Sequence, residues 1–132
     1  MYLIDSSMCV SILRKRLPKA VERLHSMSAD DLGISAVSVG ELYHGAAKSA
    51  QPQAEMRKVQ ELLTLLRPIA FGSEAALAYG LVRSFLERKG QVIGSFDMLI
   101  AAHALSADAT LVTHNTREFG RLPDLRVEDW TG

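Results

Sequence analysis

The chain has 132 residues, of which 48% are hydrophobic, and its 15 basic and 15 acidic side chains leave no net charge. This length and composition suit one domain, residues 1–132, whose core needs no disulfide or structural metal. The one cysteine, Cys9, excludes a disulfide framework and a cysteine-rich zinc site, and we expect it to be a small core residue. Neither a signal peptide nor a membrane span is predicted, so we expect a cytoplasmic protein with no membrane partner.

Short apolar runs alternate with helical patterns along the chain. Residues 1–5 are too short a run for a helix and predict a strand, and we expect Ser6 or Ser7 to cap the helix that follows. Pro18 is expected near the start of a second helix. The next elements are predicted in this order: a strand over 32–35, a helix from Ser35 or Ser38 to about residue 50, and a helix over 52–66.

The second half continues the alternation. Pro68 is expected to stop the helix and to precede a short strand over 69–71. Further on we expect a long helix capped by Ser73 and ended by Gly90, a helix over 96–107 capped by Ser95, a strand over 110–113, and an edge strand within 125–130. Strands separated by helices imply parallel pairing, so the predicted class is α/β. In such sheets, ligands bind beyond the carboxyl ends of the strands.

Three acids and one amide interrupt or border apolar segments, where a charge is costly. Asp5 closes the first strand, Glu41 lies in the first third of its helix, and Asp97 lies in the first turn of an almost wholly apolar helix. Asn115 follows the fourth strand. Because Asp5 and Asn115 lie at the carboxyl ends of parallel strands, we expect these side chains to converge.

Each of these residues also has an ordinary structural explanation. Asp5 can cap a helix, Glu41 and Asp97 can complement a helix dipole, and Asn115 can serve as a turn residue. As a set they say more, because three carboxylates about 5 Å apart repel by roughly 3 kcal/mol per pair at an effective dielectric near 20. A domain with about 5–15 kcal/mol of net stability must relieve that repulsion by taking up protons or a cation.

Carboxylates without clustered His or Cys favour a hard cation, Mg²⁺ or Mn²⁺, which can activate water and stabilise charge on a phosphate. This predicts a metal-dependent hydrolase, and a nuclease above all. Other chemistries fit worse, because His25, His44, His103 and His114 form no zinc motif and neither a G-x-S-x-G elbow nor a glycine-rich phosphate loop is present. We expect the histidines to be structural, although His114 is close enough to Asn115 to face the pocket.

Basic residues gather early in the chain. The favoured interpretation is a solvated helix face, and a surface for a phosphodiester strand is the alternative. The residues concerned are Arg14, Lys15, Arg16, Lys19 and Arg23.

Four segments together resemble a known family. They are Met-Tyr-Leu-Ile-Asp-Ser-Ser at the start, Ser-Val-Gly-Glu-Leu-Tyr-His-Gly around Glu41, Ser-Phe-Asp-Met-Leu-Ile-Ala-Ala-His-Ala around Asp97, and Leu-Val-Thr-His-Asn-Thr-Arg-Glu-Phe near the end. In order and spacing they resemble a PIN domain, and more narrowly a VapC-type toxin of a bacterial type II toxin–antitoxin pair. The resemblance covers essentially the whole chain.

The resemblance implies a three-layer α/β/α sandwich with a central parallel sheet, a homodimer, and Mg²⁺- or Mn²⁺-dependent endoribonuclease activity. It also implies a VapB-like antitoxin whose tail occludes the site. Carried onto this chain, the catalytic and metal-binding acids are Asp5, Glu41 and Asp97, with Asn115 as the fourth polar position. Ser6 keeps a hydroxyl for phosphate or a metal-bound water. Asn115 replaces an acid, which leaves a second metal open, and Glu118 is the candidate substitute.

Two other classes compete with this reading. One is a degenerate PIN domain that binds RNA or a partner without cutting, and retention of all three acids argues against it. The other is a phosphotransfer or phosphatase domain, which would need a second acid two positions after Asp5. A housekeeping nuclease of the same fold also stays open, and the sequence does not reveal which RNA is cut.

Overall fold

The computed structural model describes residues 1–15 and 17–131, and within them it contains a five-stranded, fully parallel sheet. The strands lie in the order β3-β2-β1-β4-β5, with β1 at the centre. Their bounds are β1 Tyr2–Ile4, β2 Leu32–Ser35, β3 Arg67–Ile69, β4 Thr110–Val112 and β5 Val127–Glu128. The predicted α/β class with a parallel sheet is therefore confirmed, and so is the edge strand near the end of the chain.

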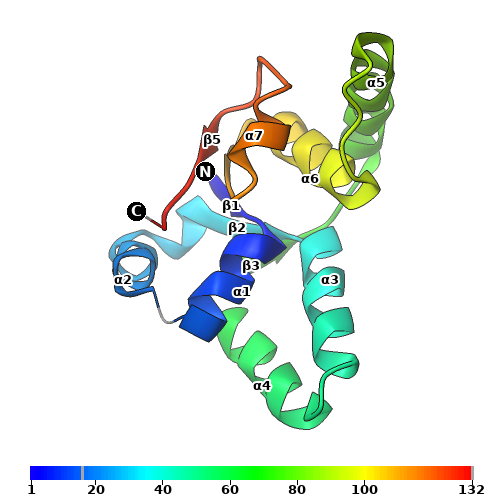
Figure 1. Cartoon of the computed structure of the whole chain (residues 1–132). Coiled ribbons are helices and arrows are strands. Elements are labelled where there is room, and N and C mark those ends of the chain that lie inside the picture. The colour runs from blue at the N-terminus through cyan, green and yellow to red at the C-terminus, as the bar shows by residue number, and fades with distance from the viewer. Residues whose placement is uncertain (16, 132) are drawn as a thin grey trace.

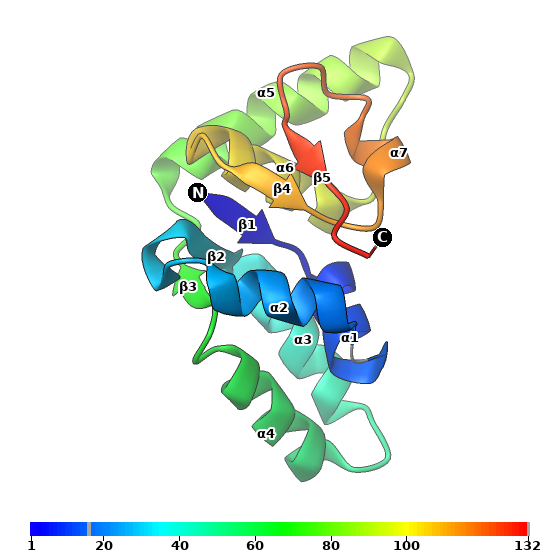
Figure 2. The ribbon, with the colours of Figure 1, turned by 90° about the vertical axis from the view of Figure 1, so that its left-hand side faces the viewer.

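Helices cover both faces of this sheet. Figure 2 shows α1 to α4 on one side of the strands and α5 to α7 on the other, which confirms the three-layer sandwich. The bounds are α1 Ser6–Lys15, α2 Pro18–Ser26, α3 Ala36–Ala47, α4 Pro52–Leu62, α5 Ser73–Lys89, α6 Ser95–Ser106 and α7 Thr116–Phe119, with a short 3₁₀ helix, η1, over Ala29–Asp31. No helix in the described ranges is long and apolar enough to cross a membrane.

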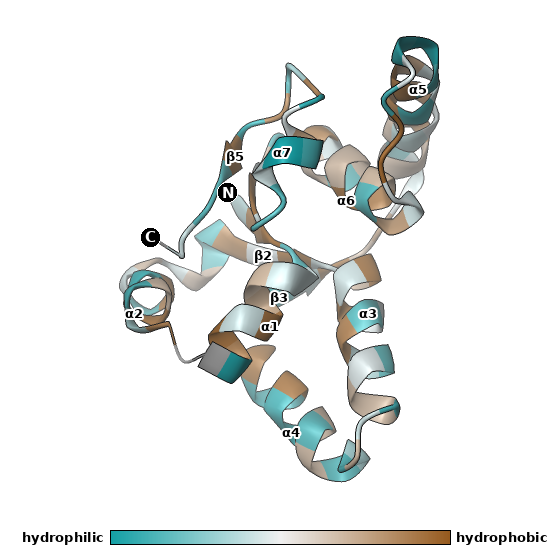
Figure 3. Ribbon diagram, viewed as in Figure 1, coloured by the Kyte–Doolittle hydropathy of each residue, from teal (hydrophilic) through white to brown (hydrophobic). Residues whose placement is uncertain are grey.

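The alternation of side chains along the strands divides the core in two. Ile4 and Val112 pack with the helices of the first half, whereas their neighbours Leu3 and Leu111 pack with the helices of the second half. All four side chains are fully buried. The surface helices α2 and α4 carry hydrophobic and hydrophilic residues on different sides, as Figure 3 shows, so each presents an apolar face to this core.

Strand pairing places the first acid. Ile4 pairs with Val112, and the Asp5 N–H donates to the Val112 carbonyl at 3.0 Å. Asp5 and the residues after β4 therefore leave the sheet at the same carboxyl edge. In Figure 1 the N-terminal ends of α1, α3 and α6 come together beside this edge.

The start of α1 corrects one expectation. Asp5, and neither Ser6 nor Ser7, caps the helix, because Asp5 Oδ1 accepts a hydrogen bond from the Met8 N–H at 2.9 Å. The two serine hydroxyls donate to carboxylates instead. At α3 the expectation of a Ser35 cap is confirmed, since its Oγ accepts from the Val37 N–H at 3.2 Å.

Other boundaries differ from the prediction for local reasons. The helix expected to reach residue 66 ends at Leu62, and the following strand starts at Arg67 and includes Pro68. Proline is tolerated there because β3 lies at the sheet edge. No described side chain caps α5 or α6, whose N-cap residues are Gly72 and Gly94 instead of the expected serines.

The end of α5 follows the prediction. Gly90 adopts the left-handed conformation at φ 65°, and its N–H closes the last helical turn on the carbonyl of Glu87. This reversal lets the chain turn back into α6.

Candidate active site

Asp5 is the most deeply placed of the acids, at 4% exposed. Its Oδ1 accepts hydrogen bonds from the Ser7 hydroxyl at 2.8 Å and from the Met8 N–H. Burial raises the pKa of the Asp5 carboxyl, and hydrogen bonds from Thr113, Met8 and Ser7 oppose that rise. The Asp5 carboxylate is thus both the cap of α1 and the buried acid of the site, and its Oδ1 forms the cap.

Glu41 reaches the same place from the second turn of α3 and is half-buried. Its Oε1 accepts a hydrogen bond from the Ser6 hydroxyl at 3.1 Å, which ties α3 to the start of α1. Burial raises the pKa of Glu41, the Ser6 hydrogen bond opposes this, and the charges of Asp97 and Asp5 raise the pKa further.

Asp97 approaches from the first turn of α6 and is also half-buried. Burial raises the pKa of its carboxyl, and the charges of Asp5 and Glu118 add to the rise. Gly94 lies directly against it, because a Cβ at that position would be 3.6 Å from Asp97 Oδ2. The acid therefore sits close to the turn that begins α6.

The structure thus brings together the three acids that the sequence singled out, and Glu118, the candidate substitute at the fourth position, acts on one of them. Each of Asp5, Glu41 and Asp97 has a raised pKa, and two of these values are raised in part by the charges of other members of the set. Glu118 lies on α7 and acts on Asp97. The catalytic roles of these residues stay a prediction.

Asn115 lies at the same sheet edge but in a different setting. It is half-buried, its N–H donates to the Thr113 hydroxyl at 3.0 Å, and its carbonyl accepts from Phe119 in α7 at 3.2 Å. Among the described residues, no hydrogen bond joins the Asn115 side chain to any of the acids. Its position fits the predicted fourth polar site, and its backbone also serves the turn into α7.

The donor set suits a hard divalent cation, because every candidate ligand is a carboxylate oxygen. Burial is the largest cause of the raised pKa values of the three acids, so their charged forms are costly here and a bound cation would offset that cost. Across 1–15 and 17–131, however, no group of three or more His, Cys, Asp or Glu side chains is already arranged to hold a metal ion. The acids are therefore the right type of ligand for such an ion, but their side chains do not form a closed coordination shell.

A hydrogen-bonded neighbour of the site was only partly anticipated. His114 bonds Ser11 Oγ through Nε2 at 2.6 Å, and its Nδ1 lies 3.5 Å from Asp129 Oδ1. The His114 charge also lowers the pKa of Asp5. The histidine therefore links the C-terminal segment to α1 beside the acids, and no sequence motif reveals these contacts.

Two further residues have structural roles, as expected. His103 is 3% exposed, its Nδ1 lies 2.7 Å from Ser35 Oγ, and burial lowers its pKa. Cys9 is fully buried, and burial raises the pKa of its thiol. Neither side chain is available as a nucleophile or a metal ligand.

The basic residues near the start of the chain disperse over several environments. Arg23 pairs with Glu128 at 3.0 Å and lies over the Trp130 ring at 4.5 Å, so it fastens α2 to the end of the chain. Arg14 is exposed and lines a groove beside α3 and α4. Arg16 lies outside the described residues.

Comparison with known proteins gives a consistent family. Residues 2–125 match the model of the PIN domain. The chain is 35% identical to "Ribonuclease VapC2" of Rickettsia felis, covering 98% of this chain and 97% of that protein. It is 32% identical to "tRNA(fMet)-specific endonuclease VapC" of Salmonella typhimurium, again over 98% and 97% of the two chains.

Solved structures agree over the same length. A VapBC2 structure from Rickettsia felis bound to a promoter DNA fragment superposes with a TM-score of 0.92 at 35% identity, covering 98% of both chains. A DNA-bound VapBC structure from Salmonella typhimurium superposes with a TM-score of 0.93 at 32% identity, covering 98% of this chain and 97% of that one. The chain belongs to the PIN-domain family, among its VapC members.

Proposed function

We propose that this protein is a metal-dependent endoribonuclease and the toxin of a toxin–antitoxin pair. The observation that carries the proposal is the set of acids Asp5, Glu41 and Asp97, which three separate elements bring to one edge of the sheet and whose pKa values are all raised. A domain that only bound a partner would gain nothing from burying these acids close together. Relatives named as VapC ribonucleases, at 32–35% identity over nearly the whole chain, support RNA as the substrate.

The chain's own residues define how the reaction would be organised. Asp5, Glu41 and Asp97 would hold Mg²⁺ or Mn²⁺, which when bound supplies an activated water and charge stabilisation for the phosphate. Ser7 and the Met8 N–H fix the Asp5 carboxylate in orientation, and Ser6 does the same for Glu41. Holding the reacting groups in alignment can remove a large part of the activation free energy of a reaction.

Ser6 and Asn115 complete the proposed site. Ser6 Oγ gives its hydrogen to Glu41 and still has acceptor capacity, while the Asn115 amide can both donate and accept. Both are candidates to orient water or a phosphate oxygen. Attack by water on the phosphodiester would leave a 5′-phosphate and a 3′-hydroxyl.

The decisive experiment follows cleavage of a single-stranded oligoribonucleotide with and without EDTA. Wild-type protein should cut in Mg²⁺ or Mn²⁺, and excess chelator should stop it. Asp97→Asn should abolish cleavage, whereas the matched control Asp124→Asn, which removes an exposed carboxylate outside the acidic set, should leave it intact. Activity that survives the chelator, or a 2′,3′-cyclic phosphate product, would refute the mechanism. RNA binding without any cutting in metal would favour the degenerate PIN domain.

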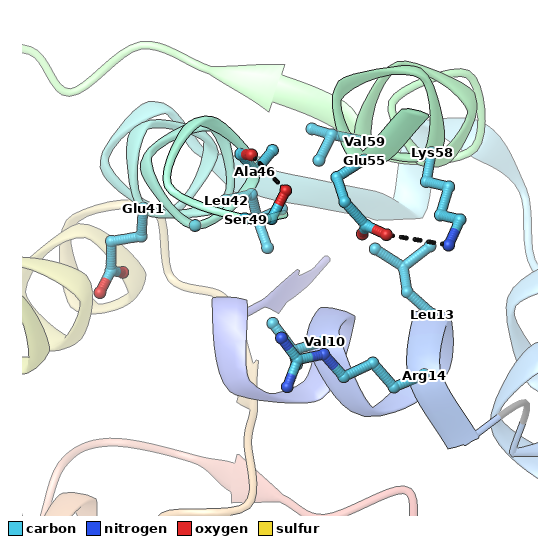
Figure 4. A pocket seen from close by; sticks show the side chains of 11 residues that line it. Val10, Leu13, Arg14, Glu41, Leu42, Ala46, Ser49, Glu55, Lys58 and Val59 are labelled. Carbon is cyan, nitrogen blue, oxygen red and sulfur yellow. Dashed lines mark hydrogen bonds and ion pairs between the residues drawn. The ribbon is translucent and has the colours of Figure 1, made fainter. Parts of the chain in front are cut away.

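A groove beside the acids is a candidate antitoxin site. Figure 4 shows it between α1, α3 and α4, with Glu41 at one end, and its volume is about 460 Å³. Its apolar lining includes Val10 and Leu13 of α1, Leu42 of α3 and Val59 of α4. A peptide with an apolar face could lie in this groove and place an Arg or Lys against the carboxylates.

The structure corrects which residues are available there. The apolar candidates for such contacts in the sequence are Met8, Ile12, Leu13, Val39, Leu42 and Tyr43. Of these, Met8 and Ile12 are 0% and 7% exposed, belong to the core and do not line the groove. They point inward because the apolar face of α1 covers the sheet. Leu13 and Leu42 do line the groove, and the half-buried Val10 joins them.

Co-expression with the product of a neighbouring gene tests the partner. Asp5→Ala should abolish cleavage and largely preserve co-purification, because the groove contacts remain. Leu13→Asp should weaken co-purification and leave cleavage by the free protein intact. A wild-type protein with no co-purifying partner, or toxicity that persists in Asp5→Ala, would favour a housekeeping nuclease.

Self-association is part of the same proposal. Leu77 and Leu81 lie one helical turn apart on α5 and are 68% and 64% exposed. Two large apolar side chains on one stripe are costly to leave in water, so we place the homodimer contact on this face of α5.

A further inference from the structure

A hollow of about 730 Å³ lies between the C-terminal part of α5 and α7, and its walls are basic. The cationic side chains of Lys89, Arg117 and Arg121 line it, and no acidic residue is among its described lining. The charge of this hollow is therefore opposite to that of the acidic site.

The three cationic side chains differ in the contacts that they already make within the protein. The Arg121 guanidinium donates to the carbonyls of Gln91 and Val92, at 3.4 and 3.2 Å, and so fastens the loop after α5 to the wall. Lys89 Nζ lies 5.7 Å from the centroid of the Phe85 ring. Arg117 is exposed, and its side chain forms no hydrogen bond or ion pair within 1–15 and 17–131. Arg117 and Lys89, which both line the hollow, can therefore donate hydrogen bonds to a ligand.

Chain connectivity joins the hollow to the acids. Arg117 immediately precedes Glu118 on α7, and the charge of Glu118 raises the pKa of Asp97. Asn115, the predicted fourth polar position, lies two residues before Arg117. A strand whose scissile phosphate lay at the acids could thus continue past α7 into the basic hollow.

The electrostatics of the reaction explain why such a hollow is needed. The acidic site repels a polyanion, and the protein as a whole has no net charge to attract one. Phosphate contacts from Arg and Lys provide most of the affinity of non-specific nucleic-acid binding, and a guanidinium matches two phosphate oxygens at once. Positive side chains near the acids would add to the charge of a bound cation in holding a polyanionic strand.

We propose that this basic hollow binds a backbone phosphate of the RNA strand next to the one that is cut, with Arg117 as its principal ligand and Lys89 as its second. This inference rests on the proposed ribonuclease function and adds the surface that holds the substrate. The contact is to the backbone, so it positions the strand without selecting its sequence.

The test measures binding of a fluorescent single-stranded oligoribonucleotide without metal, in the cleavage-inactive Asp97→Asn background, from about 50 to 300 mM KCl. Loss of one phosphate contact on a single strand lowers the slope of log Kd against log salt by about 0.7. Arg117→Gln should show this change and weaken binding several-fold at low salt, and Arg117→Lys should retain part of the affinity. The matched control is Arg57→Gln, which removes an exposed arginine of α4 outside the hollow.

Cleavage kinetics in the otherwise wild-type protein give a second readout. A contact to a phosphate that does not react contributes equally to the ground state and the transition state, so Arg117→Gln should raise KM several-fold and change kcat by less than about twofold. Equal effects of Arg117→Gln and Arg57→Gln on the salt slope would overturn the inference.

Three other outcomes separate the hypotheses. Wild-type cleavage with an unchanged KM in Arg117→Gln would refute this inference alone and leave the ribonuclease function standing. Loss of antitoxin co-purification in Arg117→Gln with unchanged RNA binding would assign the hollow to the protein partner. A wild-type protein that neither binds nor cuts RNA would refute both proposals.

Discussion

Removing one acid should stabilise the metal-free protein while it abolishes catalysis, and Asp97→Asn is the sharpest case. Asp97 is half-buried, burial raises its pKa most, and the charges of Asp5 and Glu118 add to the rise. Two carboxylates about 6 Å apart at an effective dielectric near 20 repel by about 3 kcal/mol, and solvent screening at a half-exposed site reduces this to about 1 kcal/mol. Two neighbours therefore cost about 2 kcal/mol.

Part of the stabilisation expected for Asp97→Asn is offset, because the charge of Asp97 interacts favourably with the dipole at the start of α6, by about 0.5 kcal/mol. The net stabilisation is about 1.5 kcal/mol, which corresponds to a rise in Tm of about 5 °C for a domain of this size. Asn preserves the shape of the side chain, so the effect isolates the charge.

The pH dependence has a definite sign. Because the folded-state pKa values of Asp5, Glu41 and Asp97 are raised, the folded protein holds more protons than the unfolded chain between the unfolded value near 4 and the raised folded values. The contribution of these acids to stability therefore falls as pH rises through that window. The advantage of Asp97→Asn should be full at pH 8 and absent below about pH 4, where the carboxyls are protonated in both states.

Thermal melts in EDTA and in Mg²⁺ provide the assay. Magnesium at about 100 times its Kd adds about 2.7 kcal/mol to the wild type, or about 10 °C, and much less to the variant, so the order of the two Tm values should reverse. The reasoning fails if wild type and Asp97→Asn melt together at pH 8 in EDTA, or if the control Asp124→Asn is stabilised as much. A wild-type Tm that ignores millimolar Mg²⁺ would count against the metal site.

The remaining predictions concern the fold and the assembly. Ser35→Ala should lower the free energy of unfolding by about 2 kcal/mol in urea titrations, because it removes a helix cap and leaves the ring of His103 without its partner. Ser38→Ala should instead be neutral or stabilise by up to about 1 kcal/mol, since the buried Ser38 hydroxyl finds no hydrogen-bond partner among the described residues, and a loss equal to that of Ser35→Ala would contradict this contrast. Leu81→Arg should convert a dimer into a monomer in light scattering without lowering the Tm, and a wild-type protein that is already monomeric at micromolar concentration would remove the α5 contact from the proposal.

Much of the fold could be predicted because hydrophobic periodicity and turn residues agree along the chain. The predicted strand over 32–35 coincides with β2, and Gly90 ends α5 as expected. The stretch from Leu63 to Pro68 differs from the prediction for a physical reason. Leu63 and Leu66 continue the helical spacing and are half-buried and fully buried, so their burial imitates a helix although the helix has already ended. The bounds of the edge strand follow from its pairing with β2, in which Gly33, Ile34 and Ser35 lie opposite Arg67, Pro68 and Ile69.

The candidate acids could be predicted, and their supporting contacts could not. Asp5, Glu41 and Asp97 stand out because each borders an apolar run, a property of the sequence itself. The hydrogen bonds from Ser6 to Glu41 and from His114 to Ser11 span 35 and 103 residues, and no local pattern encodes them. From the sequence, a helix cap and a functional acid are alternative roles for Asp5. In the structure the two roles are compatible, because Asp5 Oδ1 caps α1 while the carboxylate belongs to the acidic set.

The three acids differ in how firmly hydrogen bonds hold them, and this explains how they can cluster without a preformed metal shell. Asp5 Oδ1 accepts hydrogen bonds from the Ser7 hydroxyl and the Met8 N–H, so the start of α1 fixes this carboxylate. Glu41 and Asp97 are half-buried, and Glu41 is held by a single hydrogen bond from Ser6, so their carboxylates can rotate at little cost. A rigid acid flanked by two adjustable acids limits their repulsion while the site is empty of cations, and lets them close on a cation when one is present. Asp5→Asn should therefore weaken metal affinity with little change at the α1 cap, since the amide oxygen can replace Oδ1.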